Sequence, residues 1–199
     1  VSLVDTLGLD GTDSSHTQLM DQVAGADVLL WVCKANQPAR ALDITALSSI
    51  RQWFAEHPER IPPPIVVVVT HSDRIPPTDT WNPDEWELPF PLTAADNTDQ
   101  TDPAIVKQCN IGAAVDAVRN ALALGPDTAV VPVALPPALP VFNVQGVIDA
   151  LKLHTERATN AQLNRRRVEH VNTSPSWSSR LGQLNSLLKR TRSRFWPQA

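Results

Sequence analysis

The sequence predicts an α/β domain built on a parallel β-sheet with helices on both faces. Short runs of apolar, mostly β-branched residues alternate along the chain with longer amphipathic stretches. A short continuous apolar run is typical of a strand that is buried on both faces, and strands that alternate with helices usually pair in parallel. The 199 residues are 42% apolar, which is enough for the core of one domain.

The elements follow one another in a regular order. Four apolar runs predict strands over residues 1–4, 28–33, 65–69 and 129–133. Apolar residues at helical spacing predict helices over about residues 15–25, 40–57 and 103–124. A further long helix is expected to begin near Asn143, whose side chain is suited to cap the first turn. The acidic segment 74–102 contains several prolines and predicts an inserted surface loop, with partner binding by residues 79–102 as the alternative.

Charge is distributed unevenly along the chain. Residues 1–156 hold eight Lys and Arg against 20 Asp and Glu, a net charge of −12, whereas residues 157–199 hold nine against one, a net charge of +8. We therefore expect a sheet domain over residues 1–155 and a basic helical extension over residues 156–199. Because the chain opens without Met on an apolar run, we also expect that it is truncated at its N-terminus.

The basic extension has the pattern of an amphipathic helix. An apolar stripe is formed by Trp177, Leu181, Leu184, Leu188 and Phe195. It is surrounded by Arg180, Lys189, Arg190, Arg192 and Arg194, with Trp196 close by. Two interpretations stay open: attachment to an anionic membrane surface, and packing on a partner or on the protein itself. Nucleic acid binding through residues 165–167 is disfavoured, because no aromatic-lined groove or known module accompanies these arginines.

Several classes of protein are excluded. Two cysteines, Cys33 and Cys109, cannot form a disulfide framework, and Cys33 is expected to be an inert core thiol. The five histidines show no metal-ligand spacing, and no G-x-S-x-G motif predicts a hydrolase nucleophile. There is no apolar run of about 18 residues and no secretory signal. We expect a cytoplasmic protein, peripheral at the inner face of the membrane if the basic extension binds lipid.

Polar motifs follow three of the predicted strands. Asp5-Thr6-Leu7-Gly8 comes after the first strand and Thr70-His71-Ser72-Asp73 after the third, and Val133-Ala134-Leu135 ends the fourth. The carboxyl ends of parallel strands meet at one edge of a sheet, where ligands bind in open α/β folds. The alternative is that Asp5 and Asp73 have no role in binding and occur at the strand ends only because turns favour Asp.

In order and position these motifs resemble the D-x-x-G, N/T-K-x-D and S/C-A-K/L motifs of P-loop GTPases of the Ras-like class. The Era/TrmE-like branch is the most similar, over residues 1 to about 155. The resemblance implies a three-layer G domain in a GTP-binding, GTP-hydrolysing switch protein that uses Mg²⁺ and acts on a protein effector. It assigns Mg²⁺ to Asp5, the γ-phosphate to Thr6 and Gly8, the guanine base to Thr70, His71 and Asp73, and its carbonyl oxygen to the amides near Ala134 and Leu135.

The chain also departs from the family pattern. Leu7 stands in place of Pro, and His71 replaces the Lys that covers the purine, although an imidazole can still stack on it. Leu9 stands where a water-orienting Gln is usual, so hydrolysis needs another group, from a partner, a dimer or a potassium ion. No G-x-x-x-x-G-K-[ST] loop occurs, and we expect this loop and its strand upstream, with that strand between those at 1–5 and 28–33.

Without a phosphate-binding loop, the 199 residues alone are expected to be inactive as a GTPase. A second hypothesis of a different class therefore stays open. On that hypothesis the chain is a non-catalytic GTPase remnant that binds a partner or a membrane through its basic extension.

Overall fold

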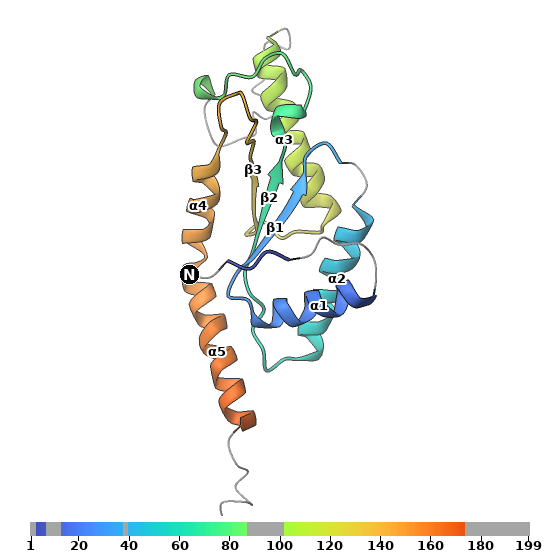
Figure 1. The fold of residues 1–199 in the computed structure, drawn as a ribbon, viewed down its shortest axis with the longest axis vertical. Helices are drawn as coiled ribbons and strands as arrows, with labels where there is room; N and C mark the ends of the chain where they lie inside the picture. Colours follow the sequence, from blue (N-terminus) through green and yellow to red (C-terminus); the bar gives the residue numbers. More distant parts are fainter. Residues whose placement is uncertain (1–2, 7–12, 38–39, 87–101, 174–199) are drawn as a thin grey trace, which may run out of the picture.

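The computed structural model describes residues 3–6, 13–37, 40–86 and 102–173 (Figure 1). Within these ranges the α-helices and strands follow one another in the order α1 (Asp13–Gly25), β1 (Leu29–Lys34), α2 (Ala41–Glu56), β2 (Ile65–Thr70), α3 (Pro103–Ala121), β3 (Ala129–Pro132), α4 (Val144–Leu153) and α5 (Thr155–Thr173). Two short 3₁₀ helices, η1 (Ser72–Arg74) and η2 (Pro83–Glu85), lie between β2 and α3. The α/β prediction is confirmed for this part of the chain.

The three strands form a parallel sheet in the order β1-β2-β3. Strand β2 is central, and its residues 66–69 are buried because helices cover both of its faces. The predicted strands at 28–33, 65–69 and 129–133 are therefore confirmed, with ends that move by one residue. All three strands run upward in Figure 1, so their carboxyl ends meet at the upper edge of the sheet.

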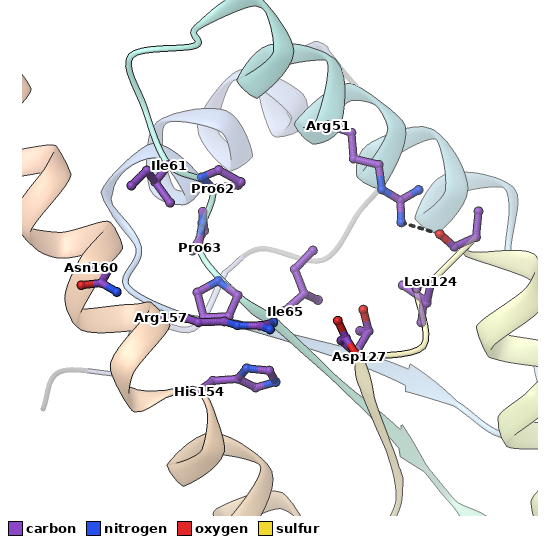
Figure 2. Close-up of a pocket in the computed structure, with 14 residues that line it drawn as sticks. Arg51, Ile61, Pro62, Pro63, Ile65, Leu124, Asp127, His154, Arg157 and Asn160 are labelled. Carbon is purple, nitrogen blue, oxygen red and sulfur yellow. Dashed lines mark hydrogen bonds between the residues drawn. The ribbon is translucent and has the colours of Figure 1, made fainter.

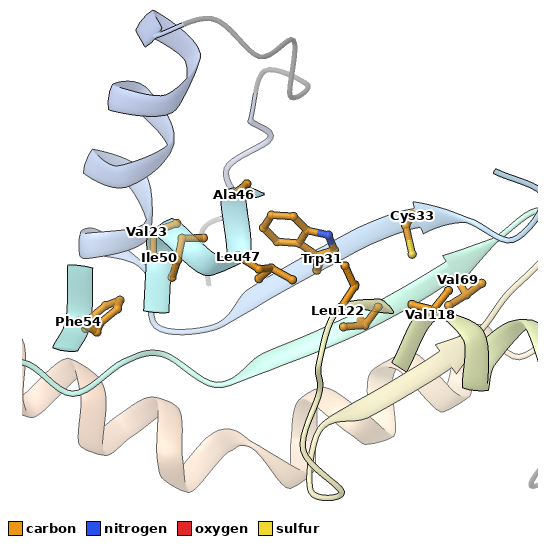
Figure 3. Close-up of a cluster of buried hydrophobic side chains, with 11 residues drawn as sticks. Val23, Trp31, Cys33, Ala46, Leu47, Ile50, Phe54, Val69, Val118 and Leu122 are labelled. Atoms are coloured by element: carbon orange, nitrogen blue, oxygen red, sulfur yellow. The ribbon is translucent and has the colours of Figure 1, made fainter. Parts of the chain in front are cut away.

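One face of the sheet packs against α1, α2 and α3 (Figure 3). Trp31 and Cys33 of β1 and Val69 of β2 meet the buried face of α2, where Leu47 and Ile50 are fully or almost fully buried. The indole N–H of Trp31 donates to Asp43 Oδ1 at 3.0 Å. Burial raises the pKa of the Cys33 thiol, as expected for an inert core cysteine.

The other face of the sheet is covered by α4. Val66 and Val68 of β2 pack with Val131 and Val133 and with Ala150 of α4. The register places residues 30 and 32 of β1 on this same face, beside residues 66 and 68. Their side chains are 40% and 57% exposed, so α4 covers β2 and β3 but not β1.

The predicted strand over residues 1–4 is wrong for the part that the structure describes. Leu3 and Val4 form no strand, and their side chains are 87% and 65% exposed. Residues 1–2 lie outside the described ranges. A strand is stabilised by pairing with a neighbour that satisfies its backbone groups, and neither residue pairs with β1.

The predicted cap of α4 is also wrong. Asn143 has a left-handed backbone, with φ of 55°, and its side chain accepts no hydrogen bond from the first turn of the helix. Its amide instead donates from Nδ2 to the carbonyl oxygen of Pro132 at 3.0 Å. The side chain therefore ties the start of α4 to the end of β3.

Helix α5 continues below α4 and packs on the sheet domain. Ala161 is buried, and the Arg165 guanidinium forms an ion pair of 2.7 Å with Asp27 and donates to the carbonyl oxygen of Ala26. Asn164 bonds the chain at Glu59 and Ile61. The described part of the predicted basic extension, residues 156–173, thus contacts the sheet domain. The apolar stripe from 177 to 195 lies outside the described residues.

Candidate nucleotide site

The loop at residues 70–73, which follows β2, is bonded to β1 on one side. The hydroxyl of Thr70 donates to the carbonyl oxygen of Cys33 at 3.2 Å, and His71 Nδ1 lies 2.9 Å from the Thr70 Oγ1 atom. A hydroxyl has one hydrogen, so a Thr70 that donates to Cys33 must accept from His71. His71 therefore carries a proton on Nδ1. Its backbone is left-handed, with φ of 61°, and it starts the short helix η1.

The same loop is fixed to β3 on its other side. The backbone N–H of Ser72 donates to the carbonyl oxygen of Val133 at 3.3 Å, and its hydroxyl donates to the carbonyl oxygen of Val69. Ser72 is fully buried. The fold therefore brings the loop at 70–73 beside the segment that begins at Val133, as the sequence predicts.

Lys107 of α3 holds this loop by hydrogen bonds and was not predicted from the sequence. Its side chain is fully buried, and its ammonium group donates to the carbonyl oxygens of Asp73, at 2.7 Å, and Ile75. The same group lies 5.2 Å from the centre of the Trp81 ring, a cation–π contact. Burial lowers the pKa of Lys107, and the nearby carboxylates of Asp73 and Asp79 partly oppose that shift.

The described part of the acidic loop packs on the domain. The rings of Trp81, Trp86 and Phe142 contact one another edge to face, with centroids 5.2 to 5.8 Å apart. The Trp81 indole donates to the carbonyl oxygen of Pro140 at 2.9 Å. This part of the predicted surface loop does lie at the surface, with exposed side chains at positions 79, 82, 84 and 85, while its two tryptophans pack against Phe142. Residues 87–101 lie outside the described part.

Asp73 is the candidate base-binding carboxylate. It is half-buried, and within the described residues its carboxylate makes no hydrogen bond and no ion pair. Only its main-chain carbonyl is engaged, by Lys107. The backbone of Asp73 is thus fixed, and its carboxylate, which lies near the Lys107 ammonium, has no hydrogen-bond partner among the described residues.

In the segment after β3, one of the two backbone amides predicted to bind the base is already used within the chain. The N–H of the buried Ala134, expected to meet the guanine carbonyl, donates instead to the carbonyl oxygen of Phe142 at 3.3 Å. Ala134 and Phe142 form an antiparallel bridge, which takes that amide away from any ligand. Leu135 is 67% exposed, and its N–H has no partner in the described chain.

The predicted phosphate and metal residues do not join the base loop. Asp5 and Thr6 are exposed, and residues 3–6 cross the molecule near the lower end of the sheet, whereas β2 ends at the upper edge (Figure 1). Gly8 lies outside the described residues. Among the side chains that are described, no group of three or more His, Cys, Asp or Glu is placed to hold a metal ion.

The described helices include none that is both long enough and apolar enough to cross a membrane. Comparison of the chain with protein families, with curated proteins and with solved structures finds no match.

Proposed function

We propose that this chain carries the base-recognition part of a GTP-binding, GTP-hydrolysing switch protein. The observation that supports it is the open carboxylate of Asp73 at the carboxyl end of the central strand. Three contacts hold its loop: Thr70 to β1, Ser72 to β3 and Lys107 from α3. A site that must discriminate between bases needs its polar groups fixed before the ligand arrives.

The chemistry of Asp73 selects guanine over adenine. A carboxylate only accepts hydrogen bonds, and guanine presents two adjacent donors, N1–H and the exocyclic amino group. Adenine has an acceptor at N1, so it would leave one carboxylate oxygen desolvated and unpaired at a cost of about 1–3 kcal/mol. His71, two residues earlier, is suited to stack on the purine. On the β3 side, the N–H of Leu135 has no partner in the described chain and is suited to meet the guanine carbonyl.

The phosphates would have to be held by groups other than the described ones. The 199 residues contain no G-x-x-x-x-G-K-[ST] motif, and Asp5 lies away from the base loop. We therefore derive no hydrolytic step and no metal-dependent step from this geometry. Nucleotide affinity of the 199-residue chain is expected to be millimolar or weaker, because most of the binding energy of a nucleotide comes from its phosphates in such proteins.

The proposal is tested by ligand-observed NMR at millimolar nucleotide, which detects weak binding. GDP is expected to show saturation transfer that competes with guanosine, whereas ADP shows none at the same concentration. Asp73→Ala is expected to abolish the GDP signal. The matched control is Asp84→Ala, which removes an exposed carboxylate from η2 that contacts none of these loops. Equal signals from GDP and ADP in the wild type would refute the assignment of this loop to a guanine base.

A second candidate function is a non-catalytic interaction module. The engaged amide of Ala134 favours it, because one of the expected base contacts is used within the chain. Exposed apolar side chains in the segment between β3 and α4 and on α4 itself also favour it: Leu135, Leu139, Val141, Val144 and Ile148. Such a module would bind a protein partner and ignore both nucleotides in the same NMR experiment.

A further inference from the structure

A cavity of about 550 Å³ opens at the lower end of the sheet, away from the candidate nucleotide site. It lies where β2 and β3 begin, between the segment 61–65, the segment 123–128 and the junction of α4 with α5 (Figure 2). This volume lies within the range of about 300–1,000 Å³ that is typical of small-molecule sites. Its size alone does not identify a ligand, but the side chains around it do.

His154 is the most informative of these side chains. It is the single residue between α4 and α5, it is 7% exposed, and its ring faces the cavity (Figure 2). Its backbone N–H and carbonyl are bonded within the helices, but its ring makes no hydrogen bond to any described residue. The His154 ring nitrogens are not among the fully buried, unpartnered polar atoms of the described residues, so they are reached from the cavity. They are therefore available to a ligand that enters it.

Two arginines line the same cavity. Arg157, in the first turn of α5, is exposed and makes no ion pair and no side-chain hydrogen bond in the described chain. Arg51 of α2 donates to the carbonyl oxygens of Leu122 and Ala123, at 2.8 and 3.2 Å, which holds its guanidinium at the rim. Two cationic groups therefore share one cavity, and neither is neutralised by an acidic side chain.

The remaining wall is apolar, with one acidic group on the rim. Residues 62–64 are three consecutive prolines, and Ile65 and Leu124 complete the surface. Asp127 lies on the rim and is exposed, and it pairs with neither arginine. Prolines and aliphatic side chains provide a rigid surface for the apolar part of a ligand, because they lose little conformational freedom when it binds.

We propose that this cavity binds a small organic oxyanion, a carboxylate or a phosphate monoester attached to an apolar body. The oxyanion lies between the guanidinium of Arg157 and the ring of His154, because a guanidinium presents a planar fork of donors that matches carboxylate and phosphate oxygens. The apolar body packs on the proline wall. The site is separate from the nucleotide site, since the two lie at opposite ends of the strands.

The experiment is a titration of the 199-residue chain followed by the ring carbon–hydrogen NMR signals of histidine. Phenyl phosphate and benzoate are the two probes, which share an apolar ring and differ in the oxyanion, and benzyl alcohol is the uncharged control. His154→Gln assigns the His154 signal. At least one oxyanion is expected to shift that signal saturably, and the alcohol is not. The probe that binds with the higher affinity shows whether the cavity prefers a phosphate monoester or a carboxylate.

Three substitutions test the placement of the ligand. Arg157→Ala is expected to weaken binding about tenfold, because it removes a charge-assisted contact. Arg166→Ala is the matched control: it removes an exposed arginine from the same helix, outside the cavity, and is expected to change binding less than about twofold. Asp127→Asn is expected to tighten binding, since it removes a negative charge from the rim.

The proposal is overturned if neither probe moves the His154 signal, or if benzyl alcohol moves it as strongly as the oxyanions. It is also overturned if Arg157→Ala and Arg166→Ala weaken binding equally, because the attraction would then be a general effect of charge. All of these results are independent of whether the chain binds GDP at the other end of the sheet.

Discussion

The two ends of the sheet are built in opposite ways. At the upper end, where the strands finish, the loop at 70–75 is held by bonds to β1, β3 and α3, and the Asp73 carboxylate is left open. At the lower end, the cavity keeps the His154 ring and the Arg157 guanidinium without partners. At the upper end, hydrogen bonds fix the backbone around an unpartnered carboxylate, whereas at the lower end an exposed arginine and a histidine ring line a cavity. The comparison teaches that a loop with a fixed backbone and a lined cavity are two separate signs of a binding site.

The largest expected effect comes from removing the hydrogen bonds of Lys107 at the upper end of the sheet. Lys107→Met keeps most of the volume but leaves the carbonyl oxygens of Asp73 and Ile75 without their buried donor. We expect the free energy of unfolding to fall by about 2–4 kcal/mol, measured by urea denaturation. The matched control is Lys34→Met at the end of β1, where the lysine is exposed and makes no side-chain bond. It is expected to change stability by less than about 0.5 kcal/mol.

The pH dependence of the same variants tests how Lys107 is held. The pKa of Lys107 is lowered in the folded protein below its ordinary value of 10.5, mainly by burial. In the range between the folded pKa and 10.5, the unfolded chain binds more protons, so stability rises with pH there. The wild type is therefore expected to gain stability relative to Lys107→Met as the pH rises toward 10.5. The difference in free energy of unfolding between the wild type and Lys107→Met should therefore grow with pH. If it stays constant or shrinks over that range, burial does not lower the pKa of Lys107.

A second pair of substitutions compares the two ends directly. Thr70→Val removes the hydroxyl that joins β2 to β1, and we expect a loss of about 1 kcal/mol. His154→Leu removes a polar ring that has no partner in the described chain, and we expect no loss, or a gain of up to about 1 kcal/mol. Thermal unfolding of both variants checks the contrast. A loss for His154→Leu as large as that for Thr70→Val would show that the ring stabilises the fold and is not kept for a ligand.

A third pair of substitutions concerns α5, which forms one side of the cavity. Arg165→Ala removes the ion pair with Asp27 and a bond to the Ala26 carbonyl, and we expect a loss of about 1 kcal/mol. Arg166→Ala is the neighbouring control and is expected to change stability by less than about 0.5 kcal/mol. Equal effects of the two would mean that α5 is held by its apolar contacts alone.

Sequence patterns predicted the strands correctly where the burial of apolar side chains determines whether a strand forms. Helices cover both faces of the strands predicted at 65–69 and 129–133 and one face of the strand predicted at 28–33, and an apolar run indicates such burial. The run at 1–4 has the same composition, but Leu3 and Val4 pair with no strand and lie exposed. Composition reports a preference for burial, and it cannot report whether a neighbouring strand is there to pair with.

The candidate site was predicted only in part, for a related reason. The loop at 70–73 and the segment after Val133 follow from the strand order, and the structure brings them together. The role of Lys107 did not follow, although its spacing of four residues from the buried Ile111 places it on the core face of α3. The bond from Ala134 to Phe142 depends on a fold-back of the chain that no local pattern specifies.

The central claim, that Asp73 reads a guanine base, is tested most directly by reversing the hydrogen bond. Asp73→Asn replaces an acceptor with a donor, and xanthine presents an acceptor where guanine presents its amino group. The measurement is the affinity of GDP and xanthosine diphosphate for the wild type and for Asp73→Asn, by ligand-observed NMR. The account predicts that the wild type prefers GDP and that the variant prefers the xanthosine nucleotide. A variant that keeps the preference of the wild type would contradict it.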